Sequence, residues 1–206
     1  MGFYICEGPN GAGKTTLIKS LANDGYKTLS SPNGTPLAQM LRSACRGTTP
    51  WEDIDPRIQF MLFSAARYDE YIRLVRDSND IVVADRWWTS TFIYQCCLQG
   101  IELDFLEYTK CPDEKISKVI LLDGDDDVLI QRVVAEREKN PQHGICSWTK
   151  DVEKQKKLIH LYREEMPPYL TRRGIPFEII DTTSRTCDEV KALVVEILRK
   201  ENEQAK

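Results

Sequence analysis

A glycine-rich stretch at residues 8–15, GPNGAGKT, constrains the fold of this chain more than any other feature. It matches the pattern G-x-x-x-x-G-K-[ST] of a phosphate-binding loop. The apolar run before it, residues 3–6, predicts a buried strand. Apolar residues at helical spacing over 17–22 predict a helix that ends at residues 23–25, Asn-Asp-Gly. A strand, a glycine loop and a helix in this order are typical of the start of a parallel α/β sheet.

The loop carries the groups that a bound nucleotide needs. Its glycines allow backbone N–H groups to turn toward a phosphate, and the helix N-terminus adds positive potential. We expect Lys14 to reach the β- and γ-phosphates and the Thr15 hydroxyl to bind Mg²⁺. The alternative is a plain glycine turn before a helix. The residues of the loop predicted to bind ATP are Gly8, Asn10, Gly11, Ala12, Gly13, Lys14, Thr15 and Thr16.

Four further strands are predicted at residues 26–30, 81–84, 119–122 and 177–180, and the last three end at Asp85, Asp123 and Asp181. Continuous apolar runs such as 81–84 and 119–122 are typical of strands buried on both faces of a parallel sheet. Helical patterns separate the runs. We therefore expect an α/β protein with a five-stranded parallel sheet flanked by helices, in a single domain over residues 1–206.

Capping residues mark the starts of three helices. Thr35 followed by proline opens one helix, and Asp55 followed by proline opens a longer one. Thr186 and Glu189 form a capping box before the last helix. The apolar positions of the longer helix are Ile58, Leu62, Ala65, Ala66, Ile72 and Val75. Residues 138–149 contain few apolar residues and predict a mobile loop between two helices.

A second group of polar residues, Asp85 and Arg86, follows the predicted strand at 81–84. Ligands of open α/β sheets bind beyond the carboxyl ends of the strands, so these residues should face the phosphate loop. A carboxylate there suits Mg²⁺, and the guanidinium fork of Arg86 suits a second phosphate group. The alternative is a surface Asp-Arg pair at a strand end.

Composition excludes several classes of function. The net charge of −4 provides no overall positive field for nucleic acid or a membrane surface, and no stretch approaches 18 apolar residues. Seven cysteines without a C-x-x-C pair indicate reduced thiols in a cytosol-like compartment. Two histidines give little support to a histidine-based metal site. We therefore expect a cytoplasmic protein with no nucleic-acid or membrane partner.

From residue 3 to about residue 198, the sequence resembles the thymidylate kinase family of nucleoside monophosphate kinases. The most specific segments are CEGPNGAGKTT, which is similar to the family's phosphate loop, and DRWWTSTFIYQ, which is similar to its Asp-Arg-aromatic signature. NGTPLAQMLR, MLFSAARYDEY and FEIIDTTSRTCDEV resemble its first substrate-side helix, its base-binding segment and its adenine-side turn. The resemblance implies a three-layer P-loop kinase fold with a lid, here at about residues 137–149.

The resemblance also implies roles for individual side chains. Phe63 would stack on a pyrimidine, Arg67 would bind the base edge, and Tyr94 would exclude a 2′-hydroxyl. Catalytic roles would fall to Lys14, Asp85, Arg86 and Arg137, metal binding to Thr15 and Asp85, and further ATP binding to Arg132. The implied substrate-binding residues are Asn10, Arg42, Phe63, Arg67, Arg86, Thr91, Tyr94 and Gln95.

Three acids found in the family are missing from this chain. The family usually has a carboxylate at the position of Asn10, where it contacts the sugar 3′-hydroxyl, and often an aspartate at the position of Thr89. Bacterial members often read Arg-Glu-Pro-Gly-Gly-Thr where residues 30–35 read SSPNGT, so that Ser31 replaces a glutamate. These departures leave the sugar contact, the metal shell and the preferred base open.

The implied reaction is transfer of the γ-phosphoryl group from MgATP to a deoxynucleoside monophosphate, most simply dTMP. The alternatives are a kinase for another or base-modified monophosphate, such as dUMP, and a nucleotide-binding module without turnover. The phosphate loop contains no arginine, so a further catalytic cation is expected from Arg132, Arg137 or Lys139. The partners implied are small nucleotides, with a homodimer by analogy to the family.

Overall fold

The computed structural model describes residues 2–46, 54–109, 115–139 and 151–204. Within these residues, five parallel strands form one sheet in the order β2-β3-β1-β4-β5. The predicted five-stranded parallel sheet is thereby confirmed. The strands are β1 (Gly2–Glu7), β2 (Lys27–Ser30), β3 (Ile81–Asp85), β4 (Ile116–Asp123) and β5 (Phe177–Asp181).

The predicted helix starts are confirmed by their caps. The Asp55 side chain accepts a hydrogen bond from Arg57 N, and Thr186 and Glu189 bond each other's backbone N–H groups. The helices are α1 (Lys14–Asn23), α2 (Pro36–Arg46), α3 (Pro56–Glu70), α4 (Trp88–Thr91), α5 (Leu103–Thr109), α6 (Asp126–Lys139), α7 (Val152–Glu164), α8 (Met166–Arg172) and α9 (Cys187–Gln204). Two π-helical segments, η2 (Tyr71–Val75) and η3 (Phe92–Leu98), continue α3 and α4.

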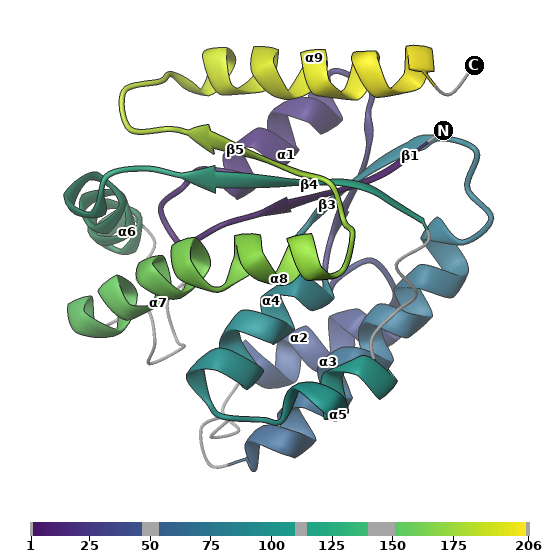
Figure 1. Ribbon diagram of the computed structural model, residues 1–206, viewed down its shortest axis with the longest axis vertical. Coiled ribbons are helices and arrows are strands. Elements are labelled where there is room, and N and C mark those ends of the chain that lie inside the picture. Colours follow the sequence, from purple (N-terminus) through teal and green to yellow (C-terminus); the bar gives the residue numbers. More distant parts are fainter. Residues whose placement is uncertain (1, 47–53, 110–114, 140–150, 205–206) are drawn as a thin grey trace.

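The molecule has three layers because side chains of the central strand alternate between two cores. Phe3 and Ile5 of β1 pack with buried residues of α3, α4, η3, α7 and α8 on one face of the sheet. Tyr4 and Cys6 pack mainly with residues of α1 and α9 on the other. Figure 1 shows α1 and α9 on one side of the sheet and α4, α7 and α8 on the opposite side.

The carboxyl ends of the strands meet at one edge of the sheet. Cys6 of β1 is in register with Asp85 of β3, and Asp123 of β4 is in register with Asp181 of β5. This register brings the loop after β1 next to the Asp-Arg pair after β3. Figure 1 shows α6 beside the arrowheads, at this same edge. The predicted location of a ligand site is therefore supported by the topology.

Two features differ from the sequence-based expectation. The predicted apolar positions of α3 and η2 form only part of the buried face. Ala66 and Val75 are buried, whereas Ile58, Leu62, Ala65 and Ile72 are exposed, and the polar Arg67 and Glu70 are buried. The predicted loop and lid also begin too early, because residues 137–139 form the last turn of α6. Residues 140–149 of the predicted lid lie outside the described residues. Among the residues that are described, no helix has the length and apolar content to cross a membrane.

Candidate active site

The phosphate loop depends on glycine at two close approaches. Gly8 has φ 140°, and a Cβ atom there would lie 2.1 Å from the carbonyl oxygen of Leu122. Gly11 has φ 83°, and its Cβ would lie 2.2 Å from the carbonyl oxygen of Leu129. A side chain at Gly8 would push the loop away from β4, and one at Gly11 would push it away from α6, so these glycines set the path of the loop.

Lys14 is a buried cation at the start of α1. Its Nζ atom donates a 2.6 Å hydrogen bond to the carbonyl oxygen of Pro9, within the loop itself. Burial lowers the pKa of Lys14 to about 7; the charge of Arg86 adds to this effect and the carboxylate of Asp85 opposes it. A bound phosphate would restore the charged form of the amine, because its negative charge favours the ammonium form.

Proton uptake on ATP binding follows from this pKa. Above about pH 7, Lys14 of the free protein is partly neutral, and binding of the phosphates raises its pKa and draws in a proton. ATP affinity should therefore fall as the pH rises above about 7. At about pH 6, Lys14 is mostly charged before binding and should make the affinity depend little on pH. Calorimetry in buffers of different ionisation enthalpy measures the uptake.

The control for this prediction is Lys14→Arg, whose guanidinium stays charged at these pH values. On ATP binding at about pH 8, this variant should take up clearly fewer protons than the wild-type protein. Equal proton uptake by the two proteins would show that Lys14 is already charged before ATP binds.

Thr15 and Asp85 form the predicted metal position. The Thr15 hydroxyl donates to Asp85 Oδ2 at 3.2 Å, and Thr15 and the neighbouring Thr16 are both exposed. Two oxygen groups from the protein suit Mg²⁺, which keeps most of its octahedral shell for water and nucleotide phosphate. Within the described residues, no cluster of three or more metal-binding His, Cys, Asp or Glu side chains is present. The donor set therefore fits a nucleotide-bound Mg²⁺ better than a permanent metal centre.

Arg86 is the most constrained residue of the site. It has φ 69°, which is uncommon outside glycine, and its backbone N–H bonds the carbonyl oxygen of Cys6 at 3.0 Å. Its NH2 group donates to Asn10 Oδ1 at 2.9 Å, and its guanidinium carbon lies 5.6 Å from the ring centre of Tyr94. Arg86 thus links the loop after β3 to the phosphate loop.

A buried carboxylate, Glu7, holds this region together. It accepts hydrogen bonds from Trp87 N (3.2 Å), Thr89 Oγ1 (2.6 Å) and Ser90 Oγ (2.8 Å), and it lies 3.7 Å from Arg86 NH1. Burial tends to lower the pKa of Arg86, but nearby Tyr94, Tyr162 and the Glu7 carboxylate outweigh it and hold that pKa high. The guanidinium therefore stays charged.

The predicted base-side residues come together. Arg67 is buried, and its NH1 group hydrogen-bonds Thr91 Oγ1. Its guanidinium carbon lies 5.4 Å from the ring centre of Phe63, one turn earlier on α3. Gln95 is buried on η3, and Phe63 itself is only half-buried. An interpretation of Arg67 as a solvated helix residue is therefore wrong, and Phe63 is not part of the closed core.

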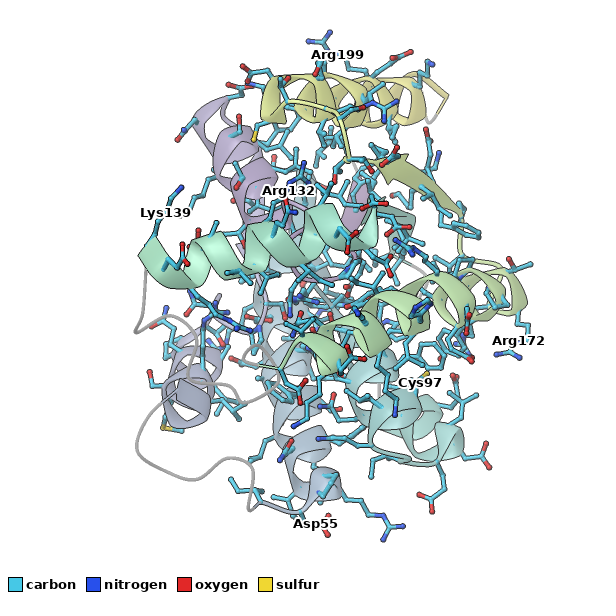
Figure 2. All side chains as sticks on the ribbon, turned by 90° about the vertical axis from the view of Figure 1, so that its left-hand side faces the viewer. Asp55, Cys97, Arg132, Lys139, Arg172 and Arg199 are labelled. Carbon is cyan, nitrogen blue, oxygen red and sulfur yellow. The ribbon has the colours of Figure 1, made fainter. Side chains whose placement is uncertain are left out.

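The other predicted cations belong to α2 and α6. Arg42 is half-buried on α2, which packs against α3. Arg132 bonds the turn after β5, donating to Thr182 Oγ1 (3.1 Å) and to the Thr182 carbonyl oxygen (2.8 Å). Arg137 is half-buried and Lys139 exposed, and Figure 2 shows Arg132 and Lys139 extending from different turns of α6. Arg132 therefore contacts the turn after β5 through its guanidinium.

Glu70 of α3 fixes the loop in which the sequence lacks a glutamate at position 31. Its buried carboxylate accepts hydrogen bonds from Ser31 Oγ (2.6 Å), Asn33 N (2.7 Å) and Gly34 N (2.6 Å). The loop before α2 is thus held by a carboxylate from a neighbouring helix.

Sequence reasoning missed four residues of the site: Glu7, Glu70, Gln155 and Tyr162. Glu7 had a signal, because it is a charged residue at the end of a buried strand and directly precedes Gly8. Gln155 and Tyr162 of α7 had none. Gln155 Oε1 accepts from Asn10 Nδ2 at 3.1 Å, a contact between residues 145 positions apart, and no local pattern predicts such a contact.

Comparisons with known proteins agree with this arrangement. The thymidylate kinase family model matches residues 6–193. A thymidylate kinase from Leuconostoc mesenteroides is 32% identical over 114 residues, 50% of this chain and 52% of that protein, so the alignment spans about half of that relative. A probable thymidylate kinase from Pyrobaculum calidifontis is 29% identical over 96% of both chains.

A solved structure shows that the whole fold is shared. The thymidylate kinase of Candida albicans superposes with a TM-score of 0.70 at 17% identity, over 98% of this chain and 92% of that one. At this identity the likeness concerns the P-loop kinase fold alone. The family match covers the phosphate loop, the Asp-Arg pair and the base-side helix together. The chain therefore belongs to the thymidylate kinase family.

Proposed function

We propose that this protein transfers the γ-phosphoryl group of ATP to dTMP, giving dTDP and ADP. The observation that carries the proposal is the 2.9 Å hydrogen bond from Arg86 to Asn10. It places an arginine suited to the acceptor phosphate directly against the loop suited to the donor phosphates. A protein that only binds a nucleotide has no need of this second phosphate-binding group.

Each half of the site has its own task. On the donor side, the loop N–H groups and Lys14 bind the phosphates of ATP, and Thr15 with Asp85 would hold Mg²⁺. The metal neutralises charge on the phosphates during transfer. On the acceptor side, Arg86 and Arg42 bind the phosphate of dTMP. Because phosphoryl transfer needs positioning and positive charge more than acid–base chemistry, this set of residues suffices for most of the reaction.

The base-side residues favour a deoxypyrimidine. A half-buried ring at Phe63 offers a stacking face, and the buried Arg67 and Gln95 offer polar groups at the edge of a base. Buried polar groups penalise a base that leaves them unpaired. The Tyr94 ring centre lies 5.6 Å from the guanidinium carbon of Arg86, the residue proposed to bind the acceptor phosphate, and this proximity supports a role for Tyr94 against the 2′-hydroxyl.

Phe63→Ala should raise the KM for dTMP at least tenfold and leave the KM for ATP unchanged, because a base-stacking face is worth roughly 1–3 kcal/mol. Phe63→Tyr keeps the aromatic face and should stay close to wild type, whereas Phe63→Leu keeps only the bulk. Steady-state kinetics with each substrate varied in turn give the comparison. A Leu variant equal to wild type would mean that Phe63 contributes packing and not stacking.

A panel of deoxy- and ribonucleoside monophosphates with MgATP tests the proposal as a whole. Release of ADP should be fastest with dTMP. A faster rate with dUMP would favour the alternative acceptor, a reading motivated by the missing acids at Asn10, Ser31 and Thr89. Tight ATP binding without ADP release for any acceptor would favour a binding module.

Three further points stay predictions. Arg137 remains the best candidate for the extra cation on the transferring group, since its buried Nε has no hydrogen-bond partner within the described residues and Arg132 is held at the turn after β5. Members of the family are commonly dimeric, and by analogy we expect a homodimer. A cytoplasmic location rests on the thiol content of the sequence alone.

A further inference from the structure

One face of helix α7 is buried and carries both polar and apolar side chains. Its buried residues, Gln155, Leu158, Ile159 and Tyr162, recur at helical spacing and form a single stripe. The two polar members lie two turns apart and both contact the phosphate-binding region. The roles proposed above for donor and acceptor binding do not use either of them.

The Tyr162 hydroxyl lies between two charged groups. It accepts a 2.8 Å hydrogen bond from Arg86 NH1 and donates a 3.1 Å hydrogen bond to Glu7 Oε2. Burial raises the pKa of Tyr162 well above its usual value, and the Glu7 carboxylate adds to this effect. The phenol therefore stays neutral and can donate and accept at once.

The other half of the guanidinium is fixed through Asn10. An arginine can only donate, so the oxygen of the Asn10 amide must face Arg86 NH2 and its nitrogen must face Gln155 Oε1. Ser90 Oγ accepts from NH1 at 3.1 Å. The fork of Arg86 is thus oriented from both ends, by two contacts that lead to α7.

We propose that Tyr162 is a positioning residue that orients Arg86 toward the acceptor phosphate. The claim rests on the proposed function, since it concerns the same phosphate. The hydroxyls of Tyr162 and Ser90 each contact both Arg86 and Glu7, and they keep the two charges 3.7 Å apart at their NH1 and Oε2 atoms. Without the Tyr162 hydroxyl, the guanidinium can turn toward Glu7 and form a direct ion pair. In that orientation, the guanidinium can no longer donate two parallel hydrogen bonds to a phosphate.

Tyr162→Phe tests the claim, with Tyr169→Phe as the matched control. Both tyrosines are buried, and both donate to a glutamate; Tyr169 of α8 donates to Glu107 Oε1 of α5 at 2.7 Å. The two variants should lose similar thermal stability. Tyr162→Phe alone should raise the KM for dTMP about tenfold, because one hydrogen bond to a charged group is lost. The KM for ATP should not change.

A second measurement separates positioning from general damage. Calorimetric binding of dTMP should weaken about tenfold in Tyr162→Phe, whereas binding of thymidine, which lacks the phosphate, should be unchanged. In an Arg86→Met background, removal of the Tyr162 hydroxyl should have no further effect on dTMP binding.

Equal weakening of dTMP and thymidine binding, or a Tyr169→Phe variant as impaired as Tyr162→Phe, would overturn the proposal. The binding measurements need no turnover, so they distinguish two failures. A wild-type protein that binds dTMP but does not phosphorylate it refutes the proposed reaction. A wild-type protein that binds dTMP no better than thymidine refutes the positioning role, because Arg86 then contributes nothing to phosphate binding.

Discussion

Replacement of Lys14 by methionine should lower kcat/KM for the conversion of ATP and dTMP roughly a thousandfold, while the protein stays folded. In the proposed reaction, Lys14 supplies positive charge to the β- and γ-phosphates, and methionine fills similar space without that charge. The lysine is buried, and burial lowers its pKa to about 7, so the folded protein gives up hydration of the amine to keep it in the loop.

Because Lys14 is buried, the Lys14→Met variant should lose activity without losing thermal stability. A thioether has no charge to desolvate, so the melting temperature should stay level or rise. Lys19→Met is the matched control, because Lys19 is exposed on the same helix. It should keep wild-type kinetics. A Lys14→Met variant with near-normal turnover, or one that loses activity only because it unfolds, would contradict the assigned role.

Replacement of Arg86 by methionine should lower kcat/KM for dTMP by roughly a thousandfold. In the proposed complex, Arg86 and the phosphate of dTMP form a hydrogen-bonded charge pair, and truncating one partner of such a pair costs about 2–5 kcal/mol. ATP binding measured without acceptor should change far less. The variant should also lose some stability, since Glu7 then loses the guanidinium that lies 3.7 Å from its carboxylate. Glu7 keeps its hydrogen bonds from Trp87, Thr89 and Ser90, so the fold should survive.

The Arg86→Lys variant separates the contribution of the positive charge at residue 86 from that of the planar guanidinium. Lysine keeps the charge near Glu7 but lacks the planar fork that bonds Asn10, Ser90 and Tyr162 together. It should restore stability and recover only a small part of the activity. Full recovery of dTMP turnover by lysine would show that the orientation of the guanidinium is unimportant. Melting curves and kinetics on the same preparations make the comparison.

Much of the fold was predictable because its signals are local. The phosphate loop, the apolar strands and the caps at Asp55 and Thr186 are short patterns, and each is present where it was expected. The approach of Thr15 to Asp85 followed from a general rule, since carboxyl ends of parallel strands share one edge. Strand order was not predicted, because no local pattern specifies which strands pair.

The buried face of α3 was only partly predictable from hydrophobic periodicity. It carries Gln59, Arg67 and Glu70 beside the apolar Phe60 and Ala66, because this helix packs against the loop before α2 as well as against the apolar core. Polar residues are tolerated there since each is hydrogen-bonded: Gln59 donates to the Ile54 carbonyl oxygen, and Glu70 accepts from the loop before α2. Hydrophobic periodicity alone therefore identifies only part of the buried face.

The contacts of α7 with the phosphate loop were invisible for a different reason. Tyr162 and Glu7 are 155 residues apart, and their hydrogen bond exists only once the sheet and both helical layers are assembled. Glu7 and Tyr162 are each ordinary residues in their local sequence. What makes them functional candidates is burial beside Arg86, which is a property of the tertiary structure alone.

Transfer of label from ATP to dTMP is the most direct test of the central claim. The purified protein, MgATP labelled at the γ-phosphate and dTMP are mixed, and the nucleotides are separated over time. The label should appear in dTDP in step with loss of ATP, and the Lys14→Met variant should give almost none. Label that stays in ATP, or that is released as inorganic phosphate at the same rate with and without dTMP, would contradict the proposed reaction.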